Sequence, residues 1–263
     1  MSFATAARTV TVSIAVAALT AGCQAPAART TPVVASLSSA HQAAPDPAVG
    51  AVFTGTPWLH TCTASVLAPG NDGADGNLIL TAAHCLTGVD DATFVAGYDE
   101  HSGDVDSWHL DAVYFDPRWT DDQDPHADFA IARVSRDGGP SLAQLAGGGL
   151  RLGAAPPPGA VVTVTGYETG VGGGPITCTA STAPATHGYP SLPCRGLADG
   201  LSGAPWVMGS TVTGLVGGLN GGGCDENTSY SPPFDDAVAR LRDRAEAGGP
   251  ADDPPTVYDD ECG

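Results

Sequence analysis

The chain contains no lysine, and its ten basic residues, all arginines, are outnumbered by 29 aspartates and glutamates, so its formal charge is −19 at pH 7. A surface of this sign repels nucleic acid and anionic membranes, and both are therefore excluded as partners. Charged residues of either sign make up only 15% of the 263 residues, whereas Gly, Ala, Pro and Thr are abundant. This composition is typical of short strands joined by turns and argues against a helical bundle.

The sequence also lacks an apolar run long enough to span a bilayer. Thr9–Leu19 is apolar and follows Arg8, the only charged residue near the N-terminus, but it is shorter than the about 20 residues that a spanning helix needs. The pattern is typical of a secretory signal peptide, which we assign to residues 1–22. The chain is therefore expected to leave the cytoplasm and to be extracellular or held at the cell envelope.

The signal peptide ends in Leu19-Thr20-Ala21-Gly22-Cys23, which resembles the lipobox of bacterial lipoproteins. In a lipobox, cleavage before the cysteine follows transfer of diacylglycerol to its thiol. The resemblance therefore implies a lipid on Cys23 as the only contact with a membrane. The alternative is ordinary cleavage near Ala25 or Ala28, which releases a soluble protein. Residues 23–47, rich in Ala, Pro, Ser and Thr, predict a flexible tether.

Three residues with the chemistry of a catalytic triad follow one another along the chain. His84 lies in Thr81-Ala82-Ala83-His84-Cys85, Asp128 opens Asp128-Phe129-Ala130-Ile131-Ala132, and Ser202 lies in Gly200-Leu201-Ser202-Gly203-Ala204-Pro205. A serine hydroxyl needs a neighbouring imidazole to take its proton, and a buried carboxylate to orient that imidazole. The pattern predicts nucleophilic catalysis by a serine.

At these residues the chain resembles the chymotrypsin/trypsin-like serine peptidases, whose motifs are T-A-A-H-C, D-I-A-L and G-D-S-G-G-P in the order His, Asp, Ser. The resemblance extends over roughly residues 48–245 and implies an endopeptidase that cleaves a polypeptide substrate through an acyl-enzyme. It makes His84 the general base and acid, Asp128 the residue that orients it, and Ser202 the nucleophile. The backbone N–H groups of Gly200 and Ser202 would form the oxyanion hole.

Other residues compete weakly for these roles. Asp121, Asp122 and Asp124 lie near Asp128 in the sequence, but only Asp128 opens an apolar segment that would bury it beside His84. The remaining histidines lack a comparable context and are interpreted as loop or surface residues: His41, His60, His101, His109, His126 and His187.

Two positions depart from the family motif. Leu201 stands where the family has an aspartate, which in zymogen-activated members meets the new N-terminal amine. No Arg or Lys followed by I-V-G-G occurs near Ala48, so both partners of that ion pair are missing and activation by N-terminal insertion is not expected. Ala204 replaces a glycine beside the nucleophile. These departures leave open a catalytically weak or inactive protease-fold binding protein at the cell envelope.

Further alternatives are an esterase with the same triad and a structural envelope lipoprotein. An α/β-hydrolase is excluded, because that fold needs the order Ser, Asp, His and a strand–elbow–helix around the serine.

The resemblance places the specificity pocket at Arg195, Gly196, Gly217 and Leu219. No acidic residue lies at the base of this pocket, so a preference for Arg or Lys is not expected. Leu219 in place of a glycine would narrow the pocket toward small or medium apolar side chains. An inward-pointing Arg195 would instead favour acidic ones.

The chain has seven cysteines, and setting Cys23 aside leaves an even number that suits three disulfides in an oxidising compartment. The resemblance implies a bridge beside the catalytic histidine. The expected pairs are Cys62–Cys85, Cys178–Cys194 and, by elimination, Cys224–Cys262, with Cys194–Cys224 as the alternative to the last two.

No cofactor is expected. The sequence has no C-x-x-C or H-E-x-x-H spacing for zinc, and Asn71–Asn77 lacks the acidic residue that closes an EF-hand calcium loop.

Short apolar segments without βαβ alternation predict an all-β architecture. A first set comprises Ala48–Thr54, Thr61–Leu67, Leu78–Thr81, Val105–Phe115 and Asp128–Val134. A second comprises Val161–Gly166, Ile176–Thr179, Ala204–Met208 and Val212–Gly217. Gly147–Gly159, rich in Gly and Pro, separates the two sets and is typical of a crossing between domains.

The resemblance sharpens this prediction to two antiparallel six-stranded β-barrels of the chymotrypsin-like kind with the cleft between them. Residues 48–148 would form the first barrel and carry His84 and Asp128, and residues 149–234 would form the second and carry Ser202. Residues 235–263 predict a C-terminal helix and an acidic tail.

The predicted helix, Asp235–Ala247, places Val238, Leu241 and Ala245 on one face. By resemblance it would dock on the second barrel. The tail from Ala251 is expected to be loose unless Cys262 anchors it. We expect a monomer.

Overall fold

The computed structural model describes residues 37–70, 75–89, 91–102, 106–225 and 227–258 together with Met1, Phe3 and Cys262. The predicted signal peptide, the lipobox with Cys23 and residues 71–74 of the Asn71–Asn77 loop lie outside the described residues. Within the described part, no helix combines the length and apolar character needed to cross a membrane. The chain divides into residues 1–35 and residues 36–263, and every described helix and strand belongs to the second unit.

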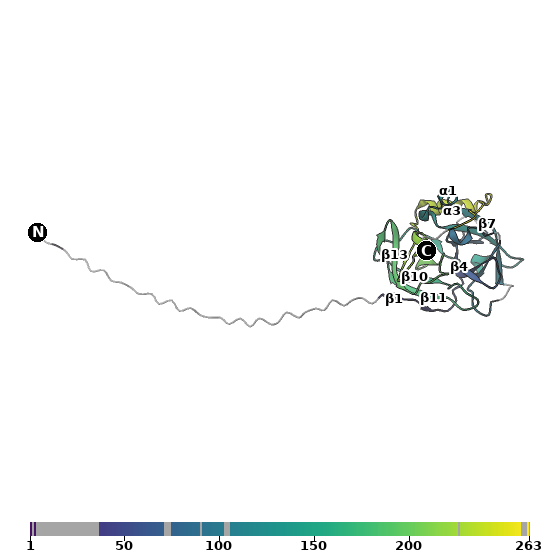
Figure 1. Cartoon of the computed structure of the whole chain (residues 1–263), viewed down its shortest axis with the longest axis horizontal. Coiled ribbons are helices and arrows are strands. Elements are labelled where there is room, and N and C mark those ends of the chain that lie inside the picture. Colours follow the sequence, from purple (N-terminus) through teal and green to yellow (C-terminus); the bar gives the residue numbers. More distant parts are fainter. Residues whose placement is uncertain are drawn as a thin grey trace. The chain divides into compact units, whose positions relative to one another are not determined.

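A closed six-stranded barrel forms the first half of this unit (Figure 1), with neighbouring strands in the order β3-β4-β5-β8-β7-β6. All of its strand pairs are antiparallel. The strands are β3 (Val49–Thr54), β4 (His60–Val66), β5 (Leu78–Thr81), β6 (Ala92–Ala96), β7 (Ser107–Phe115) and β8 (Ala130–Ser135). The sequence predicts five of them. It misses β6 because that strand has only five residues, of which Phe94 and Val95 alone are large and apolar.

The second half consists of two sheets around one core. The first sheet has the order β2-β11-β10-β14-β15-β9, and the second has the order β1-β13-β12 with β16 paired to β13. Val164, Leu192 and Trp206 are among the fully buried residues that the two sheets share. The strands are β1 (Ser38–Ser39), β2 (His41–Gln42), β9 (Arg151–Leu152), β10 (Val161–Gly166), β11 (Ile176–Ser181), β12 (Ala183–Thr186), β13 (Tyr189–Arg195), β14 (Pro205–Met208), β15 (Thr211–Leu215) and β16 (Thr228–Tyr230).

The all-β prediction is confirmed, including the closed first barrel and the C-terminal helix. The second half differs from the predicted single six-stranded barrel, because its described strands divide between two sheets.

The last part of the expected tether, residues 23–47, belongs to the fold. β1 lies parallel to β13, and β2 pairs antiparallel with β11. Ala40 N–H donates to the Arg195 carbonyl at 2.8 Å, and Ala43 N–H donates to the Pro175 carbonyl at 2.9 Å. Backbone hydrogen bonds need no apolar side chain, so the polar composition of this segment hides its strands. The tether prediction is wrong at this end.

The C-terminal helix α3 (Asp236–Glu246) begins at the N-cap Asp235. The predicted apolar face of Val238, Leu241 and Ala245 is buried. These side chains belong to the same hydrophobic core as the first barrel, and α3 lies against β7 and β8. The expectation that the helix docks on the second half is therefore wrong.

The short helix α1 (Pro117–Asp122) lies beside α3 (Figure 1), and the two line a common surface groove. Its N-cap, Asp116, accepts hydrogen bonds from the backbone N–H of Arg118 at 3.0 Å and from its Nε at 2.9 Å. Burial acts to raise the pKa of the Asp116 carboxyl, but the bonds from Arg118 outweigh it and hold the pKa below its ordinary value.

A carboxyl whose pKa is lower in the folded state stabilises the fold above its unfolded pKa, and this contribution is lost as the pH falls through the folded value. We expect Asp116→Ala to lower the free energy of unfolding by about 1 kcal/mol at neutral pH, because a helix loses its N-cap. The loss should shrink at about pH 3. Urea unfolding at the two pH values measures it, and an equal loss at both would contradict a role for the charge.

Candidate active site

Asp128 is fully buried at the end of the turn η3 (Pro125–Ala127), just before β8. Its Oδ1 accepts the backbone N–H of His84 at 2.9 Å, and its Oδ2 lies 2.8 Å from His84 Nδ1. Oδ2 also accepts the backbone N–H of Gly218 at 2.7 Å. A carboxylate can only accept hydrogen bonds, so in the neutral imidazole Nδ1 carries the ring proton and Nε2 has the lone pair. This arrangement gives His84 the tautomer of a general base.

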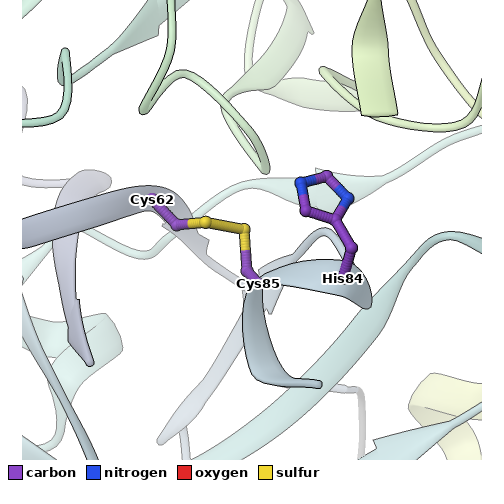
Figure 2. A group of neighbouring side chains, drawn as sticks. All are labelled: Cys62, His84 and Cys85. Carbon is purple, nitrogen blue, oxygen red and sulfur yellow. A yellow bond between two sulfur atoms is a disulfide. The ribbon is translucent and has the colours of Figure 1, made fainter. Parts of the chain in front are cut away.

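His84 begins the turn η1 (His84–Leu86), which follows β5. The next residue, Cys85, forms a disulfide with Cys62 on β4. Figure 2 shows the two sulfur atoms bonded to each other beside the imidazole. The three side chains lie close enough to hold a metal ion. However, neither sulfur is a thiolate in the disulfide, and we interpret the group as a covalent support for His84.

The backbone of Ser202 lies against this same region. The backbone N–H of Thr63, on β4, donates to the Ser202 carbonyl at 2.8 Å, and Thr63 Oγ1 donates to the Gly200 carbonyl at 3.1 Å. The Ser202 carbonyl oxygen is 3.6 Å from Cys85 Sγ. The first barrel therefore holds the serine loop next to the segment that carries His84.

Two glycines next to Ser202 have backbone conformations that other residues rarely adopt. Gly200 has φ +95°, and a Cβ there would lie 2.1 Å from the Thr169 nitrogen. Gly203 has φ +82°, and a Cβ there would lie 2.1 Å from the Thr63 carbonyl oxygen. The loop keeps its course only with glycine at both positions.

Leu201 and Ala204, the two departures from the motif, are fully buried in the core of the second half. Both pack against Gly166, where an added Cβ would lie 2.8 Å from the Ala204 Cβ and 3.3 Å from the Leu201 Cγ. An acidic side chain at position 201 would sit in this apolar surrounding. The leucine instead anchors the serine loop by apolar packing.

The residues predicted for the specificity pocket lie in two places. Gly217 is buried, and its neighbour Gly218 bonds to Asp128, so this segment lies beside the histidine–aspartate pair. Leu219 begins the turn η4 (Leu219–Gly222).

Arg195 is exposed at the end of β13, where its Nε donates to Asn227 Oδ1 at 3.2 Å. Gly196 follows it with φ +83°.

Two residues that touch the predicted site, Thr63 and Tyr258, were not predicted from the sequence, and Gly218 of the predicted pocket segment has an additional contact that was not predicted. Thr63 positions the serine loop, Gly218 donates to Asp128, and Tyr258 stacks on His84 with ring centroids 5.0 Å apart. Thr63 directly follows Cys62, so the disulfide prediction could have indicated it. Gly218 lies between Gly217 and Leu219 of the predicted pocket, but its bond to Asp128 had no local signal, and neither did Tyr258, because the partners are far apart in the sequence.

The three predicted disulfides are present as Cys62–Cys85, Cys178–Cys194 and Cys224–Cys262. We expect the double variant Cys62→Ala, Cys85→Ala to lower the free energy of unfolding by about 2–5 kcal/mol and to reduce turnover even where it remains folded. The reason is that Cys85 adjoins His84. Urea unfolding and peptide hydrolysis measure the two effects.

The matched control is Cys178→Ala, Cys194→Ala, which removes the link between β11 and β13. It should lose stability without a comparable loss of turnover in its folded state. Equal losses of turnover in the two double variants would contradict the positioning of His84 by its neighbouring disulfide.

A family model described as a trypsin-like peptidase domain matches residues 62–219. The chain belongs to the trypsin-like peptidase family. The matched range contains His84, Asp128 and Ser202. A comparison with curated proteins finds no match.

Solved structures of two proteases and of a heparin binding protein share the fold of this trypsin-like peptidase. A protease named Anisep from Arthrobacter nicotinovorans is 20% identical, with a TM-score of 0.67, and the match covers 79% of this chain and 99% of that one. A thermostable serine protease, AL20, from an extremophilic microorganism is 22% identical, with a TM-score of 0.64 over 78% and 99% of the two chains. Human heparin binding protein is 16% identical, with a TM-score of 0.60 over 82% and 98%.

Proposed function

We propose that this protein is an exported serine endopeptidase that uses Ser202 as nucleophile, His84 as base and Asp128 as the orienting carboxylate. The observation that carries the proposal is the contact between the buried Asp128 and His84 Nδ1, which in the neutral imidazole places the lone pair on Nε2. In the reaction, Ser202 Oγ attacks the carbonyl carbon of a peptide bond while its proton moves to Nε2. His84 then returns that proton to the leaving amine, and water hydrolyses the acyl-enzyme by the reverse path.

The oxyanion of this reaction would be held by the backbone N–H groups of Gly200 and Ser202. The two neighbouring amides are already used, since Leu201 N–H donates to Ala198 and Gly203 N–H donates to Val216. Among the described residues, no acceptor is bonded to the N–H of Gly200 or Ser202. The lack of a described partner for these two amides supports their proposed role as the oxyanion donors.

For specificity, we propose a pocket for small or medium apolar side chains at Gly217 and Leu219. The exposed position of Arg195 and its bond to Asn227 support this preference over one for acidic side chains. Export is supported by the three disulfides, which persist in oxidising compartments. Lipidation of Cys23 stays a prediction that the mass of the mature N-terminus tests.

A fluorophosphonate probe tests the proposal, because it reacts with an activated serine and with no unactivated hydroxyl. We expect one adduct, mapped by peptide mass to Ser202, and we expect His84→Ala to prevent its formation. A folded protein that takes up no probe would instead favour the binding-protein alternative. Cleavage of peptides as well as esters then separates an endopeptidase from an esterase.

The similarity to human heparin binding protein does not support the binding-protein alternative, because heparin is a polyanion. A chain with a formal charge of −19 repels a polyanion.

A further inference from the structure

The chain that follows α3 is hydrogen-bonded along the first barrel. Asp252 N–H donates to the Val113 carbonyl at 2.9 Å, and Asp252 Oδ2 accepts the Phe115 N–H at 2.8 Å. The Asp252 carboxylate also forms an ion pair with Arg244 of α3. The tail was expected to be loose unless Cys262 anchored it, and Cys262 does form the predicted disulfide with Cys224. We call residues 251–258 the C-terminal strap.

The strap continues toward the turn that carries His84. Gly88 N–H, two residues after that turn, donates to the Pro255 carbonyl at 2.7 Å. Gln123 Nε2, at the end of α1, donates to the Val257 carbonyl at 2.6 Å. Gly88 and Gln123 thus hold the strap just before Tyr258, which is its last described residue.

That residue, Tyr258, stacks on the imidazole of His84. Their ring centroids are 5.0 Å apart and their planes differ by 17°. Trp119 of α1 lies on the tyrosine as well, with centroids 5.5 Å apart. The His84 side chain is only 12% exposed, so its ring is bounded by Tyr258, by Asp128 at Nδ1 and by the neighbouring Cys62–Cys85 disulfide (Figure 2).

After Tyr258, the next described residue of the tail is Cys262, which lies next to the segment that carries the predicted pocket residues Gly217 and Leu219. Cys262 forms a disulfide with Cys224, shortly after η4, and its Sγ lies 3.5 Å from the Asn220 carbonyl oxygen. The pocket residues Gly217 and Leu219 are in the same segment. The strap is therefore bonded to the first barrel before Tyr258 and covalently linked to the pocket segment after it.

From these contacts we infer that Tyr258 determines specificity: its ring walls the space between His84 and the primary pocket. The substrate residue that directly precedes the one in that pocket would then have to carry a small side chain. This inference rests on the proposed peptidase function. Ser202 and Gly200 are held by Thr63 of the first barrel, which donates to both of their carbonyls. In this inference the strap is therefore a side wall of the site and does not hold the serine loop.

The test compares kcat/KM for two peptides that differ only at this position, one with alanine and one with leucine. Tyr258→Ala should raise the ratio of kcat/KM for the leucine peptide to kcat/KM for the alanine peptide about tenfold or more. Removing the ring adds the volume of a side chain to the pocket, and a difference of that size changes relative kcat/KM values by about this factor. Tyr258→Phe, which keeps the ring, should preserve the wild-type ratio. Val257→Ala is the matched control, since that side chain is 71% exposed, and it should leave the ratio within about twofold.

A second route uses the double variant Cys224→Ser, Cys262→Ser, which frees the far end of the strap and should move the ratio in the same direction. It keeps the inference testable where Tyr258→Ala does not fold. An unchanged ratio in folded variants overturns the inference. An equal rise in kcat/KM for both peptides also overturns it, because the strap would then block the whole site. An equal fall overturns it as well, because Tyr258 would then only support His84.

Fluorophosphonate labelling of the wild type separates failure of this inference from failure of the proposed function. Normal labelling with an unchanged ratio rejects only the role of Tyr258. Absence of labelling rejects the peptidase function, and with it the inference.

Discussion

Replacing Ser202 with alanine should lower kcat for peptide hydrolysis by about 10⁴- to 10⁶-fold. Without Oγ no acyl-enzyme forms, and only the weak catalysis that the oxyanion donors give to direct attack by water remains. The fold should persist, because Ser202 is held by its backbone carbonyl, which accepts the Thr63 N–H at 2.8 Å. Progress curves at high enzyme concentration measure the residual rate, and circular dichroism reports the fold.

Ser210→Ala provides the matched control, since Ser210 lies exposed in the turn between β14 and β15. It should leave turnover unchanged. His84→Ala should cost as much as Ser202→Ala, and the double variant should be no worse than either, because the two groups act as one unit. Near-normal turnover in either single variant would show that the triad assignment is wrong.

Asp128→Asn should lower kcat by about 10⁴-fold while leaving the fold in place. The carboxylate accepts three N–H groups, two from His84 and one from Gly218. An asparagine has only one acceptor oxygen and must turn its own N–H₂ toward one of these donors. If it faces His84 Nδ1, the ring proton moves to Nε2, and the imidazole can no longer accept the proton of Ser202.

The same variant should lower the free energy of unfolding by about 1–3 kcal/mol, because a buried donor loses its acceptor. Asp124→Asn is the control: Asp124 Oδ1 also lies 3.0 Å from a histidine nitrogen, that of His126, but this histidine side chain is 42% exposed. We expect a few-fold change in rate at most. If Asp124→Asn were the more damaging variant, the orienting carboxylate would have been misassigned.

The sequence predicted those parts of the molecule that depend on neighbouring residues. Leu78–Thr81 and Val161–Gly166 are apolar segments between turn residues, and both are strands with the predicted bounds. His84 and Asp128 were paired from separate motifs, and the structure joins them by two hydrogen bonds. The residues next to each motif carry the information that predicts its structure. For Asp128 these are the apolar residues of the segment that buries it.

The features that the sequence did not predict depend on contacts between distant segments. β1 and β2 are held by backbone bonds to strands that follow more than 130 residues later, and their polar side chains do not indicate pairing. Tyr258 lies in a stretch of Asp and Pro residues with no periodicity, although its partner His84 is 174 positions earlier. Three-dimensional proximity of this kind leaves no local pattern.

Each end of the folded unit packs against the half of the unit that is formed by the other end of the sequence. β1 and β2, at the start, pair with strands of the second half, whereas α3 and the C-terminal strap, at the end, pack on the first barrel. A cut in the segment Gly147–Gly159 would therefore give two fragments, each deprived of an element that the other carries. Neither fragment contains a complete folding unit, so the halves should unfold together in a single cooperative transition.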